Sequence, residues 1–527
     1  MTVGSWQITH NFIIMLVKTF AAAVSGISAT ITTIEVSSTK GIQFFLVGLP
    51  DVAVRESHER IISALQVNGY KFPRSRIVIN MAPADIRKEG SAYDLPLAIG
   101  VLAAAGDIDA SRLDKYMLMG ELSLDGTLQP VKGALPIAIK AREEGFTGFI
   151  LPRKNAYEAA VVDGLTIFGA DNIKEVIEFF SGKDTLVPTI IDTNKDFFDH
   201  HQLFETDFSD VRGQENVKRA LEVAAAGGHN LIMVGPPGSG KSMLAKRLPT
   251  ILPPLSLQEA LETTKIHSVA GKVGERTSLL SQRPFRSPHH TISNVAMVGG
   301  GSYPQPGEIS LAHNGILFLD ELPEFNRSVL EVLRQPLEDR HISISRARFA
   351  VDYPAGFMLV ASMNPCPCGF YNHPTRPCVC PPGAVQRYLN RISGPLLDRI
   401  DIQVEITPVP FEKISEQMPS EASIIVRERV IKAREIQKKR FEKHKGIHCN
   451  AQMSSKLLHM YAVPDDDGLS LLKNAMHRLN LSARAYDRIL KLSRTIADLD
   501  DANDIKTYHL AEAINYRNLD RESWGTI

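Results

Sequence analysis

The stretch "NLIMVGPPGSGKSMLAKRL", residues 230–248, decides the fold of the central part of the chain. An apolar run leads into a turn that matches G-x-x-x-x-G-K-[ST], and a helix-forming run follows it. In such a turn the backbone N–H groups converge on phosphate oxygens, and the helix adds its positive N-terminal dipole. Since the turn lies between a strand and a helix, as this motif requires, we interpret it as a nucleotide phosphate loop. Its residues are Gly235, Pro236, Pro237, Gly238, Ser239, Gly240, Lys241 and Ser242.

A second motif supplies the acidic groups that nucleotide hydrolysis needs. Lys241 is expected to reach the β- and γ-phosphates of ATP, and Ser242 to ligate Mg²⁺. Downstream, "GILFLDEL" (315–322) is an apolar run that ends in Asp320-Glu321. We predict that Asp320 holds Mg²⁺ through water, and that Glu321 polarises the attacking water as a base. An acidic turn alone would be an ordinary strand end, but together with the phosphate loop it indicates an ATP hydrolase.

These motifs resemble those of the AAA+ ATPases, and the resemblance assigns further residues. "LVASMN" (359–364) ends in Asn364, at the position of the polar sensor that orients water near the γ-phosphate. "ISGPLLDRID" places Arg399 at the arginine finger, which completes the site of a neighbouring subunit and so implies a ring. "LSARAYDRIL" places Arg484 at the second sensor, on a helical lid. "DVRGQENVKRALEVAA" is similar to the adenine-side segment of the family, with Gly213 and Gln214.

The segment between these motifs indicates the branch of the family. "FRSPHHTISNVAMVGGGSYPQPGEISLAHNGILFLDEL" (285–322) resembles the magnesium-chelatase-like AAA+ proteins, and from Met15 onward the chain resembles the YifB/ComM family. The resemblance implies one insertion within 284–305 and a hairpin in "HISISRARFAVDYPAGF" (341–357). In related ring helicases such hairpins point into the central channel.

The hairpin sequence can also be interpreted directly. It alternates, with Ile342 and Ile344 on one face and with Arg346 and Arg348 at or near the tip. Two cations on a pore loop suit a DNA phosphate backbone, and six subunits would multiply them; a solvated turn is the alternative. His289 and His290 are either further pore contacts or packed side chains.

Four of the five cysteines crowd into one loop. "NPCPCGFYNHPTRPCVCPP" (364–382) contains two C-x-C pairs, a pattern that suits a tetrahedral thiolate site for structural zinc. His373 is a candidate substitute ligand, and reduced thiols in a proline-stiffened loop are the alternative. Cys449 lies apart from this loop. The clustered cysteines are Cys366, Cys368, Cys378 and Cys380.

The N-terminal part of the chain resembles the proteolytic domain of Lon, which uses a Ser-Lys dyad. In "KEGSAYDLPLAIG" (88–100), alignment on the glycine places Ala92 at the position of the nucleophile. In "QPVKGALPIAIKA" (129–141), Leu135 occupies the position of the lysine. Because catalysis tolerates little displacement of its groups, we predict that this domain is not a peptidase.

Composition and the N-terminus set the remaining bounds. The chain has 527 residues, which at roughly 150 per domain predicts about three domains. Lys+Arg and Asp+Glu are both 59, so a nucleic-acid surface has to be a local patch. In "FIIMLVKTFAAAVSGISA" no Lys or Arg precedes the apolar run and Lys18 interrupts it, so we predict no signal peptide. No segment reaches about 18 uncharged apolar residues, so we predict no membrane span. A protein that consumes nucleotide is expected in the cytoplasm, and the strand-like run that begins at Met15 predicts this residue as the natural start.

The expected fold class is α/β: a Lon-like α/β domain, a P-loop AAA+ core with a parallel sheet, and a C-terminal helical lid. The expected boundaries are an upstream extension (1–14), the Lon-like domain (15–180), a linker or packed loop (181–209), the AAA+ core with its hairpins and cysteine loop (210–410), and the lid (411–527).

The resemblance implies a homo-hexameric, ATP- and Mg²⁺-dependent motor that translocates on single-stranded or branched DNA, as a branch-migration helicase in natural transformation. Two alternatives remain. One is a chelatase-type motor that remodels a protein partner, which the fused Lon-like domain disfavours. The other is an ATP-dependent protease, which Ala92 and Leu135 disfavour.

Overall fold

The computed structural model consists of two compact units. The first comprises residues 1–199 with 260–280, and the second comprises 200–259 with 281–527. The predicted extension, 1–14, lies outside the described residues. The structure describes residues 15–199, 204–301, 304–346, 349–408, 420–444, 446–479 and 481–517.

The first unit is built on a seven-stranded mixed sheet in the order β3-β4-β2-β1-β5-β8-β9. β1 (Met15–Ser25) and β2 (Ser28–Thr39) form a long antiparallel hairpin. β2 alternates between buried and more exposed side chains, as expected for a strand with one covered face. The other strands are β3 (Phe44–Val47), β4 (Arg76–Ala82), β5 (Tyr116–Leu118), β8 (Gly148–Pro152) and β9 (Thr166–Ala170), and β6 (Glu121–Leu122) pairs with β7 (Leu128–Gln129) as a separate ribbon.

Helix α3 (Asp94–Ala105) lies in the core of this unit, as its uninterrupted apolar sequence predicts. It packs on β1 and β2, and Gly100 allows the close approach, because a Cβ there would lie 2.8 Å from Val36 Cγ2. The helix ends at Gly106, which adopts the left-handed conformation (φ 87°). The other helices are α1 (Val52–Arg55), α2 (Ser57–Val67), α4 (Ala134–Glu143), α5 (Arg153–Ala159), α6 (Ile173–Phe180) and α7 (Thr193–Asp199).

At the two positions that align with the Ser-Lys dyad of Lon, this unit has apolar side chains. Ala92 lies in a short 3-10 turn and packs against the core. Leu135 is fully buried in α4. The nearby Lys140 pairs with Glu144 at 2.6 Å on the exposed face of the same helix. An apolar side chain therefore occupies the core at the position where Lon carries its lysine.

The segment between the two expected domains is partly packed. Pro188 bridges to Phe168 of β9, and Leu186 belongs to the buried core of the first unit. Phe197, on α7, is 1% exposed. Up to Asp199, this segment therefore belongs to the first compact unit.

The second unit contains a five-stranded sheet in the order β11-β14-β17-β10-β18, and every pairing in it is parallel. The parallel sheet expected for the P-loop core is therefore confirmed. Its central strands are continuous buried apolar runs, as is typical of a sheet with both faces covered. The strands are β10 (Leu231–Val234), β11 (Phe285–Arg286), β14 (Ile316–Leu319), β17 (Met358–Met363) and β18 (Ile402–Glu405).

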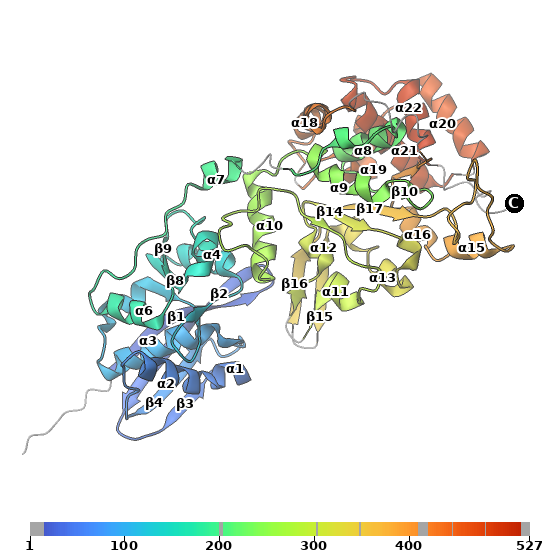
Figure 1. The fold of residues 1–527 in the computed structure, drawn as a ribbon. Helices are drawn as coiled ribbons and strands as arrows, with labels where there is room; N and C mark the ends of the chain where they lie inside the picture. Colours follow the sequence, from blue (N-terminus) through green and yellow to red (C-terminus); the bar gives the residue numbers. More distant parts are fainter. Residues whose placement is uncertain are drawn as a thin grey trace, which may run out of the picture. The chain divides into compact units, whose positions relative to one another are not determined.

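Helices surround this sheet and connect its strands (Figure 1). They are α8 (Glu215–Gly227), α9 (Lys241–Ile251), α11 (Asn294–Val298), α12 (Glu308–Leu311), α13 (Arg327–Glu331), α14 (Pro336–Asp339), α15 (Ala384–Leu389) and α16 (Gly394–Leu397). Helix α10 (Leu257–Val269) begins in the second unit, but from Ala260 to Leu280 the chain belongs to the first.

Two short hairpins occupy the expected insertions. β15 (His341–Arg346) pairs with β16 (Phe349–Pro354), and β12 (Gly299–Gly300) with β13 (Gln305–Pro306). The hairpins touch, because the Tyr353 hydroxyl donates to Pro304 O at 2.7 Å. Ile342 and Ile344 are both buried, as their alternation predicts. Arg346 ends β15, and Arg348 lies outside the described residues.

The C-terminal part is helical, and α18 and α21 pack against α8 of the core (Figure 1). Arg440 and the fully buried Asp498 form an ion pair within this helical part, with Nη1–Oδ2 at 2.7 Å. Among the described residues, no helix is both long enough and apolar enough to cross a membrane. The helices are α18 (Ser423–Arg440), α19 (Ser455–Tyr461), α20 (Asp466–Arg478), α21 (Ala483–Leu499) and α22 (Thr507–Asn515).

Candidate functional site

The predicted phosphate loop joins the end of β10 to the start of α9. Gly235 leaves no room for a side chain, because a Cβ there would lie 2.6 Å from Ile406 O. Gly238 (φ 76°) and Gly240 (φ 89°) adopt the left-handed backbone that turns the chain into the helix. The buried Ser239 hydroxyl has no hydrogen-bond partner among the described residues. The loop thus presents backbone N–H groups and a polar atom without a partner, which fits a bound phosphate.

The ammonium group of Lys241 is held over this loop. It donates to Gly235 O at 2.7 Å, to Pro236 O at 2.8 Å and to Asn364 Oδ1 at 3.2 Å. Burial lowers the pKa of Lys241, while the nearby carboxylates of Asp320 and Glu321 oppose that shift. The structure therefore brings the predicted phosphate-binding cation and the predicted sensor amide into direct contact.

The two predicted magnesium ligands also meet. Ser242 Oγ donates to Asp320 Oδ2 at 2.6 Å, and the Ser362 hydroxyl donates to the other carboxylate oxygen. Ser242 lies at the start of α9, after β10, and Asp320 follows β14, so both groups are at the carboxyl edge of the parallel sheet, with β17 between the two strands. A hydroxyl and a carboxylate are oxygen ligands that Mg²⁺ accepts. Sequence analysis missed Ser362, although its place two residues before Asn364 on a buried strand was a usable signal.

Glu321 follows Asp320 in an unusual backbone conformation. Its φ of 54° and ψ of 49° lie in the left-handed region, which for a residue other than glycine costs roughly 1–3 kcal/mol and is typical of functional turns. The side chain is more than half exposed, and its Oε2 lies 3.8 Å from His290 Nδ1. Of the two histidines with open roles, His290 thus lies beside the predicted base. The ring of His289 packs against that of His290, with centroids 4.1 Å apart and planes tilted by 34°.

The two predicted arginines pair with residues outside the phosphate loop. Arg399 donates to Arg334 O at 3.1 Å and to Pro395 O at 2.6 Å, and it pairs with Glu338 at 2.6 Å. Arg484, at the exposed start of α21, pairs with Asp398 at 3.2 Å. No contact found for either side chain within the described part of the chain involves the phosphate loop or the Asp320-Glu321 turn.

The segment predicted to bind adenine lines a hollow of about 850 Å³. Gly213 (φ 64°) and Gln214 (φ 63°) form its turn at the start of α8, and Gln214 Nε2 donates to Thr407 O at 2.5 Å. The phosphate-loop residues do not belong to the lining of this hollow. Its volume is sufficient for a purine base.

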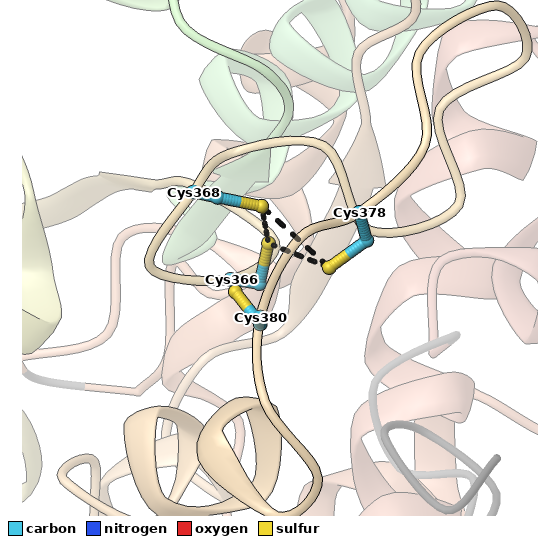
Figure 2. A group of neighbouring side chains, drawn as sticks. All are labelled: Cys366, Cys368, Cys378 and Cys380. Atoms are coloured by element: carbon cyan, nitrogen blue, oxygen red, sulfur yellow. Dashed lines mark hydrogen bonds between the residues drawn. The ribbon is translucent and has the colours of Figure 1, made fainter.

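The four clustered cysteines converge beside the sensor strand, as Figure 2 shows. All four sulfur atoms lie within 4.8 Å of one another, and the cysteines are free thiols. His373 is turned away, because its Nδ1 accepts from the N–H groups of Thr375 (3.2 Å) and Arg376 (3.1 Å). Among the described residues, these cysteines form the one group of three or more His, Cys, Asp or Glu side chains that is close enough to hold a metal ion.

Comparisons with known proteins agree with this architecture. The chain matches the family models "Magnesium chelatase, subunit ChlI" over 207–414, "Subunit ChlI of Mg-chelatase" over 34–155, and "Magnesium chelatase, subunit ChlI C-terminal" over 420–517. It is 46% identical to the protein YifB of Salmonella typhimurium over 506 residues, which are 95% of this chain and 96% of the relative. It is 44% identical to the competence protein ComM of Haemophilus influenzae over 507 residues, 95% and 97% of the two chains.

A shorter similarity links the chain to a Lon protease. The chain is 29% identical to Lon protease 2 of Bacillus subtilis over 157 residues, which are 27% of either chain. The similarity to Lon proteases that the sequence motifs suggested is therefore confirmed.

Proposed function

Because the chain belongs to the YifB/ComM family of magnesium-chelatase-like AAA+ ATPases, we propose that it is a motor that couples ATP hydrolysis to translocation on DNA. Its substrate would be single-stranded or branched DNA, and its task the branch migration of recombination intermediates during natural transformation, in the cytoplasm. The similarity to a competence protein supports this choice of substrate.

The convergence of Lys241, Ser242, Asp320 and Asn364 at one end of the parallel sheet carries the proposal for hydrolysis. Lys241 would exchange its carbonyl partners for the β- and γ-phosphates of ATP. Mg²⁺, bound between Ser242 and Asp320, would neutralise the charge that develops on the phosphates. Glu321 would accept a proton from the attacking water, since its carboxylate is exposed at the turn beside them.

The placement of Arg399 supports a ring, proposed as a homo-hexamer. In its own chain the guanidinium contacts α14 and the backbone before it, rather than the phosphate loop. A neighbouring subunit would present its nucleotide to this arginine, as the finger role requires. A single chain would then hold an incomplete site, and hydrolysis would depend on assembly.

The insertions provide a physical connection between the hairpins and the site of hydrolysis. The Tyr353–Pro304 hydrogen bond joins the β15–β16 hairpin to the β12–β13 hairpin. The β12–β13 hairpin follows in the chain the segment that contains His290, and His290 Nδ1 lies 3.8 Å from Glu321 Oε2. Contact of DNA with the hairpins would therefore be able to alter the position of the catalytic base.

A chelatase-type motor that acts on a protein partner is the second candidate. The ChlI family models favour it, because together they cover most of the chain. Such a motor would hydrolyse ATP at the same site, but DNA would not change its rate of hydrolysis. The effect of DNA on the rate therefore separates the two functions.

We expect DNA to stimulate ATP hydrolysis, and single strands or four-way junctions to do so more than duplex. An Arg346→Ala/Arg348→Ala variant should lose this stimulation. The slope of its log binding constant for DNA against log salt concentration should also fall by about one unit per lost phosphate contact. The measurement is steady-state hydrolysis with and without each DNA at several salt concentrations. The matched control, Lys438→Ala/Lys439→Ala, removes two exposed cations from the end of α18 and should behave as the wild type. Hydrolysis that ignores every DNA would favour the protein partner.

A further inference from the structure

The four-cysteine cluster has the dimensions of a metal centre. Its sulfur–sulfur distances are 3.3 Å for Cys366–Cys368, 3.7 Å for Cys366–Cys378 and 3.5 Å for Cys368–Cys378. Four thiolates bound to zinc at about 2.3 Å in a tetrahedron lie about 3.8 Å apart, whereas a disulfide requires about 2.05 Å. The observed spacing therefore suits a shared ion and not a pair of disulfides.

The surroundings of the sulfur atoms support the same assignment. Cys366 is buried, and the other three cysteines of the cluster are partly exposed, so the cluster lies at the edge of the core rather than on a free surface loop. Figure 2 shows the two cysteine pairs on facing segments of the loop, so one ion would tie the ends of the loop together.

This loop is in contact with the nucleotide site on two sides. Cys366 follows the sensor residue Asn364 by two positions, and Asn364 accepts a hydrogen bond from Lys241. On the other side, Gly369 (φ 84°) lies directly against Pro237 of the phosphate loop: a Cβ at Gly369 would be 2.6 Å from Pro237 Cδ. The Gly369 N–H group in turn donates to Cys366 O at 3.0 Å. A displacement of the cysteine loop would therefore move both the phosphate loop and the sensor.

We propose that Cys366, Cys368, Cys378 and Cys380 bind one Zn²⁺, and that this ion fixes the cysteine loop against the phosphate loop so that nucleotide binding depends on the metal. The second half of the proposal rests on the proposed ATP site; the first half does not. The metal has no part in the chemistry of hydrolysis. It sets the position of Pro237 and Asn364, which the short loop alone would leave less constrained.

The first measurement is elemental analysis of the purified full-length chain, prepared without added metal, with one zinc per chain expected. Cys378→Ser should lose the zinc, and Cys449→Ser, which changes a buried cysteine outside the cluster, should retain it. Absence of metal from the wild type, or iron in place of zinc, would overturn the assignment of the site.

The second measurement is the affinity for a fluorescent ADP analogue. Cys378→Ser should bind it about tenfold more weakly than the wild type. Gly369→Ala tests the mechanical link without touching a ligand: it should keep its zinc and still bind the analogue more weakly, because the new methyl group displaces Pro237. Unchanged affinity in both variants would overturn the coupling. A wild type that contains zinc but binds no nucleotide would instead refute the ATP site and leave the zinc site standing.

Discussion

Glu321→Gln is expected to lower ATP hydrolysis by roughly 10²–10⁴-fold and to leave ATP binding intact, because the amide cannot accept the proton of the attacking water. The substitution keeps the size of the side chain and the left-handed backbone at this position, so the loss reports chemistry rather than folding. Asp320, Ser242 and Lys241, the residues proposed to hold the nucleotide and its Mg²⁺, are untouched. The variant should therefore accumulate bound ATP and stabilise the assembled ring.

The comparison requires single-turnover hydrolysis and equilibrium ATP binding, measured on the same preparation. Glu324→Gln is the matched control, because Glu324 lies three residues further along the same turn and pairs with Arg391 at 2.9 Å. It should hydrolyse ATP at the rate of the wild type. If Glu321→Gln retained normal turnover, the base would have to be another residue.

Arg399→Ala is expected to lower hydrolysis by about 10³-fold or more, the usual contribution of an arginine finger. The expected signature is rescue in trans. Mixed with Lys241→Ala subunits, which cannot bind ATP but carry an intact Arg399, the Arg399→Ala subunits should regain part of their activity. Neither variant should be active alone.

The contacts of Arg399 within its own chain allow a competing explanation, in which the residue only anchors α14. Glu338→Gln tests it, because this change removes the ion pair and keeps the arginine. For a purely structural arginine, the loss of turnover in each variant would follow its loss of thermal stability, which is smaller for Glu338→Gln because Arg399 keeps its hydrogen bonds to Arg334 O and Pro395 O. Mixing with Lys241→Ala subunits would then restore nothing. That result would remove the finger assignment.

Sequence alone predicted the parts of the site that one motif or one strand end determines. The strand–loop–helix geometry of 231–251 follows from the spacing of its glycines, and the meeting of Asp320 with Ser242 follows from parallel strands that end at one edge. The buried isoleucines of β15 follow from simple alternation.

Other features depend on packing that no local pattern records. The helical pattern after Leu257 does not show which core it joins, yet Leu261 packs in the first unit and Ser268 O accepts from Gly133 N. These contacts explain why residues 260–280 belong to the first unit, although the sequence predicted the whole of 210–410 as the AAA+ core. The contacts His290–Glu321 and Gly369–Pro237 join segments that only the tertiary fold brings together.

The most direct test of the central claim is ATP-dependent branch migration of a synthetic four-way junction with homologous arms, followed by gel separation of the products. The account predicts that the wild type converts the junction into two duplexes only when ATP and Mg²⁺ are present, and that Glu321→Gln binds the junction but leaves it unchanged. ATP hydrolysis at a normal rate with no movement of the junction, or of any other DNA branch, would contradict the claim that this site powers translocation on DNA.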